Sequence, residues 1–492
     1  MAQWLKINGG SLASAIDLAL GTAGAGTHLS TDPPGYSPMD PTPEISYNAS
    51  LYTDGNRPVH SRSGNIIETI VVDIRGSSID DAFAKLRALK KALWEARDYF
   101  QSPGLRSPLY LEYKPHGSTN TAYSAIINAT VMEPATLLDT PLIAARINGV
   151  VITLEREPFW RERPPVRSAT VTDYATQVLG ATAITAQWGK LTVSGGNAIP
   201  GDLEALCRLY IERNDTTSNA VHEVIAGYRS VLRGGANAGN GGLIEIESGT
   251  AGTDTSVTTD ATASPGSGNT KMQCTFATLP GQATRWGKSI TSAPPGNWRV
   301  FLRARMSAGS SSSSVFLYYM GSADAVSSFR YNASVLVDDV DWKLYDLGII
   351  PIPTTSGLPS QLATTASIAL GLIADRQSGA ASLDMDFLFL VPVDESYLTL
   401  SDGTLVYSAA HSSYEYNNIL PLQETAENMR SGAQLELLAW AGDLHLPPGD
   451  GYLYVVTGHV IGNNGWFNNL TGYGVNVTLH RCALYQSARG AG

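Results

Sequence analysis

Side chains of the types that carry out catalysis are few and scattered in this chain. Eight histidines occur singly, and no Gly-x-Ser-x-Gly, His-Glu-x-x-His or phosphate-binding glycine loop is present. Asp and Glu occur in pairs throughout, but a catalytic carboxylate pair is defined by geometry that a sequence does not give. We therefore expect a protein that is not an enzyme.

One region offers side chains suited to sugar binding. Pyranose rings stack their C–H faces on aromatic rings, and their hydroxyls need a few well-placed polar groups. Residues 235–397 supply both types, and the candidate glycan-binding residues are Trp342, Tyr319, Trp298, Tyr318 and Arg303. The alternative is that the aromatic residues fill the core of a β-sandwich.

Two acidic pairs stand at the ends of the same region. Its opening Glu-Ile-Glu and closing Asp-Met-Asp segments resemble the ends of carbohydrate-binding modules, which often hold a structural calcium ion. The resemblance implies hard oxygen ligands from Glu245, Glu247, Asp384 and Asp386. Solvent-facing acids at alternate positions of a strand explain the pattern equally well. No other cofactor is expected.

Composition sets the fold class and excludes one class of partner. The chain has 492 residues, enough for about three domains. Only 16% of residues are charged and 48 are glycine, which favours a mainly β protein with many turns. The net charge of −11 argues against nucleic-acid binding, which needs clustered Lys and Arg. Residues 1–165 hold 15 basic and 17 acidic side chains (net −2), and the remainder holds 18 and 27 (net −9).

Cysteine content and the length of apolar runs indicate the cellular compartment in which the protein is made. Cys207, Cys274 and Cys482 are too few and too far apart for a disulfide framework or metal site, so we expect three buried thiols. The first residues alternate like a strand and do not resemble a signal peptide. No apolar run reaches the roughly 18 residues that span a bilayer. We expect a protein made in a cytoplasm, with no membrane span.

Residues 1–165 are predicted to form a first domain of strands and one helix. Residues 79–100 place apolar side chains at spacings of three and four, and Ser78 with Asp81 resembles a capping box. Strands are expected at 64–75, 108–114, 121–132 and 142–154, which gives a β-sandwich with an amphipathic helix packed on it. The Gly- and Pro-rich loop 21–45 is interpreted as an arm, either disordered or ordered by a neighbouring subunit.

The rest of the chain reads as strands and turns. Residues 235–397 have the strand spacing of a jelly roll. The strands of 166–234 and 398–492 have no evident sheet of their own, so we predict that they combine into one sandwich that the jelly roll interrupts. The glycine-rich segment 234–242 predicts a hinge, and therefore an insert that can be removed.

Residues 152–161 (Ile-Thr-Leu-Glu-Arg-Glu-Pro-Phe-Trp-Arg) are the most informative run. Pro158 ends a strand, and two large aromatic residues follow it. The run resembles the strand end of phage distal tail (Dit) proteins, and the domain layout is similar to the enlarged form of that family. The resemblance implies a tail-tube-like first domain and a galectin-like interrupted sandwich. It also implies a homohexameric ring in the virion tail tip that joins the tail tube protein to hub and tip proteins, with possible weak binding to a host-surface glycan.

Two other functions stay open. A secreted, non-catalytic protein with several carbohydrate-binding modules fits the aromatic candidates, but no signal peptide is visible. A receptor-binding tail fibre protein is the second alternative, although fibres commonly contain long repeats and this chain shows none.

Overall fold

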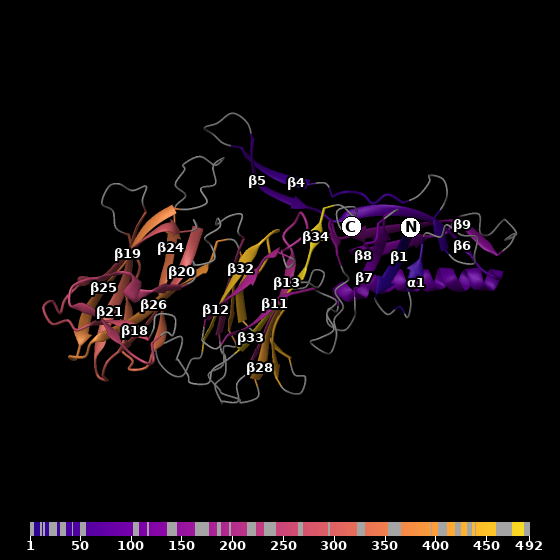
Figure 1. The fold of residues 1–492 in the computed structure, drawn as a ribbon. Coiled ribbons are helices and arrows are strands. Elements are labelled where there is room, and N and C mark those ends of the chain that lie inside the picture. Colours follow the sequence, from indigo (N-terminus) through magenta and orange to yellow (C-terminus); the bar gives the residue numbers. More distant parts are fainter. Residues whose placement is uncertain are drawn as a thin grey trace.

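The protein is mainly β, with one α-helix among the residues that the structure describes. The structure is a computed structural model, and it describes residues 4–9, 12, 15–18, 27–29, 36–41, 43–49, 56–101, 108–115, 118–134, 145–162, 177–184, 188–195, 198–213, 223–230, 243–263, 269–293, 296–321, 330–352, 366–394, 396–401, 411–418, 425–430, 435–437, 439–458 and 475–486. The molecule is elongated: a jelly roll lies at one end, a sandwich in the middle, and the N-terminal sheet and helix at the other end (Figure 1). No described helix is long and apolar enough to cross a membrane.

The first domain is built on a nine-stranded sheet of order β2-β1-β7-β8-β9-β6-β3, to which β10 and β34 are added. Its strands are β1 (Trp4–Gly9), β2 (Ile16–Asp17), β3 (Thr27–Leu29), β6 (Ile66–Arg75), β7 (Leu109–Lys114), β8 (Ala122–Met132), β9 (Arg146–Arg156), β10 (Trp160–Arg161) and β34 (Leu484–Tyr485). The last of these comes from the C-terminal end of the chain, which sequence analysis assigned to the interrupted sandwich.

The predicted helix is confirmed as α1 (Ile79–Gln101). Its first turn is capped as expected, because Ser78 Oγ accepts from the Asp81 amide at 3.2 Å and Asp81 accepts from the Ser77 amide at 2.7 Å. Its apolar stripe packs on the sheet, mainly on β8. The buried members of this stripe are Ala82, Leu86, Leu89, Leu93 and Ala96.

The predicted arm is partly packed on its own domain. β3 pairs with Val72–Ile74 of β6, and Tyr36 packs against the domain core. The Met39 amide donates to Glu68 at 3.0 Å, and its carbonyl accepts from Arg156 at 2.8 Å. Residues 21–26, 30–35 and 42 of the predicted arm lie outside the described part. The next hairpin, β4 (Pro43–Ala49) with β5 (Asn56–Ser63), projects from the domain (Figure 1).

The strand-end run that carries the family resemblance is buried in this domain. Trp160 is fully buried, and the Arg156 guanidinium lies 4.5 Å from the centre of its ring. Arg156 also pairs with buried Glu68 at 2.5 Å, and Arg161 pairs with Glu157 at 2.8 Å. Removing one partner of a buried ion pair leaves an uncompensated charge and is strongly destabilising. These two pairs therefore hold the end of β9 in place.

The middle sandwich combines strands from both sides of the jelly roll. One sheet has the order β11 (Gln177–Ile184), β33 (Val475–Cys482), β13 (Leu206–Arg213), β28 (His411–Asn417), β29 (Thr425–Arg430), β30 (Leu435–Leu437). The other has the order β12 (Trp188–Val193), β32 (Gly451–Gly458), β14 (Glu223–Ser230), β27 (Ser396–Ser401), β31 (Ala439–Asp443). One apolar core lies between the two sheets.

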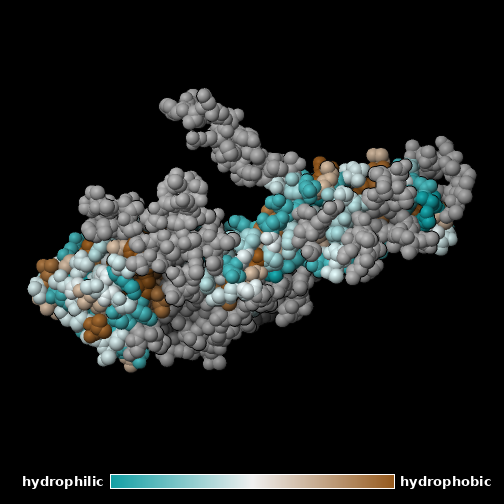
Figure 2. All heavy atoms as spheres, turned by 45° about the horizontal axis from the view of Figure 1, so that its top comes forward, coloured by the Kyte–Doolittle hydropathy of each residue, from teal (hydrophilic) through white to brown (hydrophobic). Residues whose placement is uncertain are grey.

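The jelly roll also has two sheets. The first contains β15 (Leu243–Glu245), β17 (Thr255–Thr259), β18 (Thr270–Cys274), β20 (Gly296–Met306), β24 (Lys343–Ile352) and β26 (Leu383–Pro392). The second contains β16 (Thr250–Ala251), β19 (Ala283–Ala293), β21 (Ser312–Gly321), β22 (Arg330–Tyr331), β23 (Val335–Val337) and β25 (Ala366–Ser378). A short 3-10 turn covers Ile246–Ser248. In the view of Figure 2, hydrophobic residues gather in small patches at this end of the molecule.

The jelly roll shares a hydrophobic core with the middle sandwich. Ile225, Tyr454 and Val456 of the sandwich belong to the same buried cluster as the jelly-roll core. Tyr454 meets the ring of Trp298 edge-on, with 5.8 Å between ring centres. Arg229 pairs with Asp394 at 3.1 Å across the same junction. The shared core argues against an insert that is easily removed, because its removal would expose apolar side chains of the sandwich.

Candidate functional site

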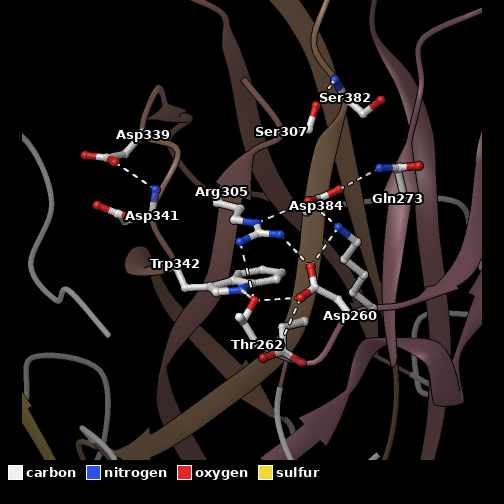
Figure 3. Close-up of polar contacts among 12 residues, drawn as sticks. Asp260, Thr262, Gln273, Arg305, Ser307, Asp339, Asp341, Trp342, Ser382 and Asp384 are labelled. Atoms are coloured by element: carbon white, nitrogen blue, oxygen red, sulfur yellow. Dashed lines mark hydrogen bonds and ion pairs between the residues drawn. The ribbon is translucent and has the colours of Figure 1, made fainter. Parts of the chain in front are cut away.

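Four of the predicted site residues, Trp342, Arg303, Asp384 and Asp386, belong to a charged network on the face of the jelly roll's first sheet that turns away from the core. Figure 3 shows part of this network, including Trp342 and Asp384. Strands alternate their side chains, so Leu383 and Met385 point into the core while Asp384 and Asp386 of β26 point outward. Neighbouring strands add cations to this face. The network consists of Asp260 and Thr262 after β17, Lys271 and Gln273 on β18, Arg303 and Arg305 on β20, Trp342 before β24, and Asp384 and Asp386 on β26.

Each acid of this network is paired with a base. Asp384 accepts from Lys271 at 2.6 Å and from Arg305 at 3.2 Å. Asp260 lies 2.9 Å from Lys271 and also pairs with Arg305. Arg303 pairs with Asp386. Three carboxylates therefore meet three cations, which leaves the network without net charge.

The electrostatics agree with a network that is satisfied internally. Burial alone would raise the pKa of Asp260, but hydrogen bonds from Thr262 and Lys271 and the charge of Arg305 hold that pKa well below its ordinary value. Burial lowers the pKa of the Arg303 guanidinium, and the charge of Asp386 opposes that shift. The lowered pKa keeps Asp260 ionised near neutral pH, as its two cationic partners require.

Trp342 is the centre of the network and is closed to solvent. Its side chain is 3% exposed, and its indole N–H donates to Thr262 Oγ1 at 2.9 Å. The guanidinium carbons of Arg303 and Arg305 lie 4.7 and 4.6 Å from its ring centre. A ring held in this way has no free face for a sugar.

Two further glycan candidates are core residues. Trp298 is fully buried at the junction with the middle sandwich, and Tyr319 packs in the jelly-roll core. Arg303 is buried beneath Trp342. The structure therefore gives four of the five candidate glycan-binding residues a buried packing position, which argues against glycan contact through them.

The four acids predicted to hold calcium are not joined into one site. Asp384 and Asp386 are fully buried and paired with cations. Glu247 accepts from Thr270 at 3.1 Å, and Glu245 lies on the strand β15. No group of three or more His, Cys, Asp or Glu side chains in the described part of the chain is arranged to hold a metal. The ion pairs argue against this ligand set, because Lys271 and Arg305 already neutralise Asp384, and Arg303 neutralises Asp386.

Tyr318 is the exception among the candidates. On β21 the core residues Val315, Leu317 and Tyr319 alternate with half-buried Phe316 and Tyr318, which face outward. Tyr318 is opposite Gly371 of β25. A Cβ placed on Gly371 would lie 2.0 Å from Tyr318 Cζ, so the ring occupies the space that a side chain at Gly371 would need.

Sequence analysis missed several members of the charged network, and it missed Phe316, which lies beside Tyr318 on the outward face of β21. Asp260, Thr262 and Lys271 carry no motif, since their meeting depends on a turn after β17 and on the pairing of β18 with β26. Phe316 had a readable signal. It lies two residues before Tyr318 in an alternating strand, so both must share a face that Tyr319 cannot share.

Comparison with known proteins gives fold-level likeness only. No family model matches the chain, and no curated protein matches it. Similar solved structures include the SPP1 Dit protein, with a TM-score of 0.23 and 9% identity over 72% of this chain and 90% of that one. They include the phage p2 baseplate, with a TM-score of 0.22 and 10% identity over 78% of this chain and 98% of that one. A carbohydrate-binding module, TmCBM61 in complex with beta-1,4-galactotriose, has a TM-score of 0.20 and 15% identity over 34% of this chain and 99% of that one. These scores are too low to assign the chain to a family.

Proposed function

We propose that this protein is a structural component of a phage tail tip that assembles through its N-terminal domain into a homohexameric ring. The observation that carries the proposal is the β4–β5 hairpin, which pairs with no other described strand and projects from the domain (Figure 1). An isolated two-stranded hairpin is marginally stable in water. Packing of the hairpin on a neighbouring copy would supply the missing contacts.

A second feature supports self-association. β3 covers only Val72–Ile74 of β6, so Ile66–Val71 is hydrogen-bonded on one side alone, to β9, among the described strands. Ile67 on this edge and Met132 on β8 are each 67% exposed. An open strand edge with apolar neighbours promotes association, and a closed ring removes such edges.

The role in the virion follows from the same proposal. The strand-end run 152–161 resembles Dit proteins, and its Trp160 and Arg156 hold the domain that carries the hairpin. A ring at the tail tip would contact the tail tube protein on one side and hub and tip proteins on the other. No catalytic step is proposed.

The test is the mass of the native particle. We expect the full chain to form hexamers by mass photometry, and a variant with residues 43–63 replaced by a short Gly-Ser segment to be monomeric. Tyr318→Ala, on the jelly roll, is the matched control and should stay hexameric. A monomeric full chain at all concentrations would contradict the ring, and a hexameric hairpin deletion would contradict the part given to the hairpin.

A specific observation favours a second property, weak binding of a host-surface glycan at Tyr318. Its ring lies over Gly371, with Phe316 two residues earlier on the same face, so two half-buried aromatic side chains lie together on the outward side of the sheet. Aromatic platforms of this kind stack on pyranose C–H faces. Copies around a ring would add avidity to weak single sites.

Two variants test the platform without disturbing the core. Tyr318→Ala removes the ring, whereas Gly371→Ala keeps it and displaces it, because the new Cβ would overlap Tyr318 Cζ. We expect both to abolish binding on a glycan array and in host-cell adsorption, with little change in melting temperature for Tyr318→Ala. Ser314→Ala, on the same face of β21, is the control. Unchanged adsorption by both variants would leave the jelly roll a purely structural part.

A further inference from the structure

The outward face of helix α1 carries a tryptophan among cations. Trp94 is 66% exposed, although tryptophan is ordinarily buried for most of its surface. Three exposed cations lie near it in the sequence. Arg87 and Lys91 precede Trp94 by seven and three residues, and Arg97 follows it by three. Residues at these spacings share one side of a helix. We call these four residues the Trp94 stripe.

Among the residues that the structure describes, the Trp94 stripe takes no part in the packing of α1 on the sheet. The buried side of α1 consists of Leu86, Leu89, Leu93 and their neighbours, which pack on the sheet. The other two lysines of the helix are neutralised within the domain, Lys85 by Asp81 at 3.2 Å and Lys90 by Glu133. Lys91 is 79% exposed in its side chain and reaches Glu95 only at 4.0 Å. The stripe therefore presents three cations, with Glu95 and Asp98 as the acids beside them on the helix.

The side chains of the stripe are those that dominate protein interfaces. Trp and Arg are the residue types most enriched among interface hot spots, and large exposed apolar groups rimmed by polar groups mark binding surfaces. The Arg97 guanidinium lies 5.4 Å from the Trp94 ring centre, which orders the indole while leaving it in solvent. A surface of this kind is arranged for contact before any partner arrives.

We propose that the Trp94 stripe docks a partner protein through a segment that presents carboxylates around apolar side chains. Charge complementarity selects this class, because Arg87, Lys91 and Arg97 surround one indole and outnumber the two partly buried acids beside them, Glu95 and Asp98. A nucleic acid is a poorer partner for a protein with a net charge of −11. A lipid surface would need a broader apolar face than Trp94 alone supplies. The inference stands apart from the ring and from the glycan platform.

The experiment uses the full chain and a defined probe. A fluorescein-labelled peptide of about 12 residues, with Asp and Glu around Leu and Phe, is titrated by anisotropy at low and high salt. We expect saturable binding that weakens with salt, and a loss of at least about tenfold in affinity for Trp94→Ala and for Arg87→Glu with Lys91→Glu. Lys288→Glu, a charge reversal on the jelly roll, should bind as the unaltered chain does.

Counter-probes make each outcome decisive. The same peptide with Asn and Gln in place of the acids should not bind. Failure of the acidic peptide to bind, or equal binding by the Trp94 and Arg87/Lys91 variants, would overturn the proposal. So would binding of phosphatidylglycerol–phosphatidylcholine vesicles or of a single-stranded oligonucleotide in place of the peptide. Because the four side chains are exposed, the variants should keep the melting temperature of the unaltered chain, which separates lost docking from lost fold.

Discussion

Removal of the jelly roll tests how the two sandwiches are joined. Deleting residues 243–394 is geometrically simple, because β14 and β27 are paired and Tyr228 lies opposite Ser396, so a short Gly-Ser joint would connect them. The deletion nevertheless uncovers Ile225, Tyr454 and Val456, which are fully buried against the jelly-roll core. Each such side chain contributes about 1.5–3 kcal/mol when buried, or roughly 5–9 kcal/mol for the three.

The loss is large compared with the roughly 5–15 kcal/mol that stabilises a typical domain. At about 2–4 °C per kcal/mol, the sandwich transition should fall by at least about 10 °C. Circular dichroism and urea unfolding would measure it, and light scattering would detect association through the uncovered patch. Threonine at the three positions should relieve the association without restoring stability. A deletion protein that stays monodisperse and melts within about 3 °C of the intact transition would refute the shared core.

Three further predictions concern single side chains. Burial lowers the pKa of His480 to about 4, and Arg208 acts in the same direction. The unfolded chain therefore takes up this proton first, so stability falls as the pH drops from 6.5 toward 4, and His480→Gln should flatten urea-derived stability in that window. Trp342→Ala should destabilise the jelly roll by about 3–5 kcal/mol without altering a glycan profile that depends on Tyr318, and equal melting temperatures would contradict its packing role. Asp260→Asn should cost about 1–3 kcal/mol, since Lys271 keeps Asp384 as its partner, and an unchanged urea midpoint would show that the network is not coupled.

Local pattern was sufficient for the helix and for the fold class. The apolar stripe of 79–100 and the Ser78–Asp81 cap are sequence-local, so they predicted α1 to within a residue. Short alternating runs with frequent glycine likewise predicted a mainly β chain. The β4–β5 hairpin was missed because residues 43–63 carry few of the β-branched residues that mark strands, and their pairing is visible only in three dimensions.

The positions of the candidate glycan-binding residues could not be predicted for a different reason. Adjacent residues of a strand face opposite ways, so Tyr318 and Tyr319 could never share one binding face, and the strand pattern alone separates them. The position of Trp342 had no such signal. Its burial depends on Arg303 and Arg305, which lie on another strand about 40 residues earlier. Residue type alone could not distinguish an outward-facing aromatic residue such as Tyr318 from aromatic residues that pack in the core.

The contacts between neighbouring domains also determine how glycan sites on the proposed ring would act together. Tyr318 belongs to a jelly roll whose core continues into the middle sandwich through Trp298 and Tyr454. The sandwich in turn reaches the first domain through β34, which pairs with β10, and through Arg481 with Glu162 at 3.4 Å. Packed contacts of this kind, unlike a glycine linker, hold binding sites at fixed spacing. Linked sites gain avidity only where their spacing matches that of the ligands, so a ring of rigid arms would favour cell surfaces whose glycans are dense enough to meet several platforms at once.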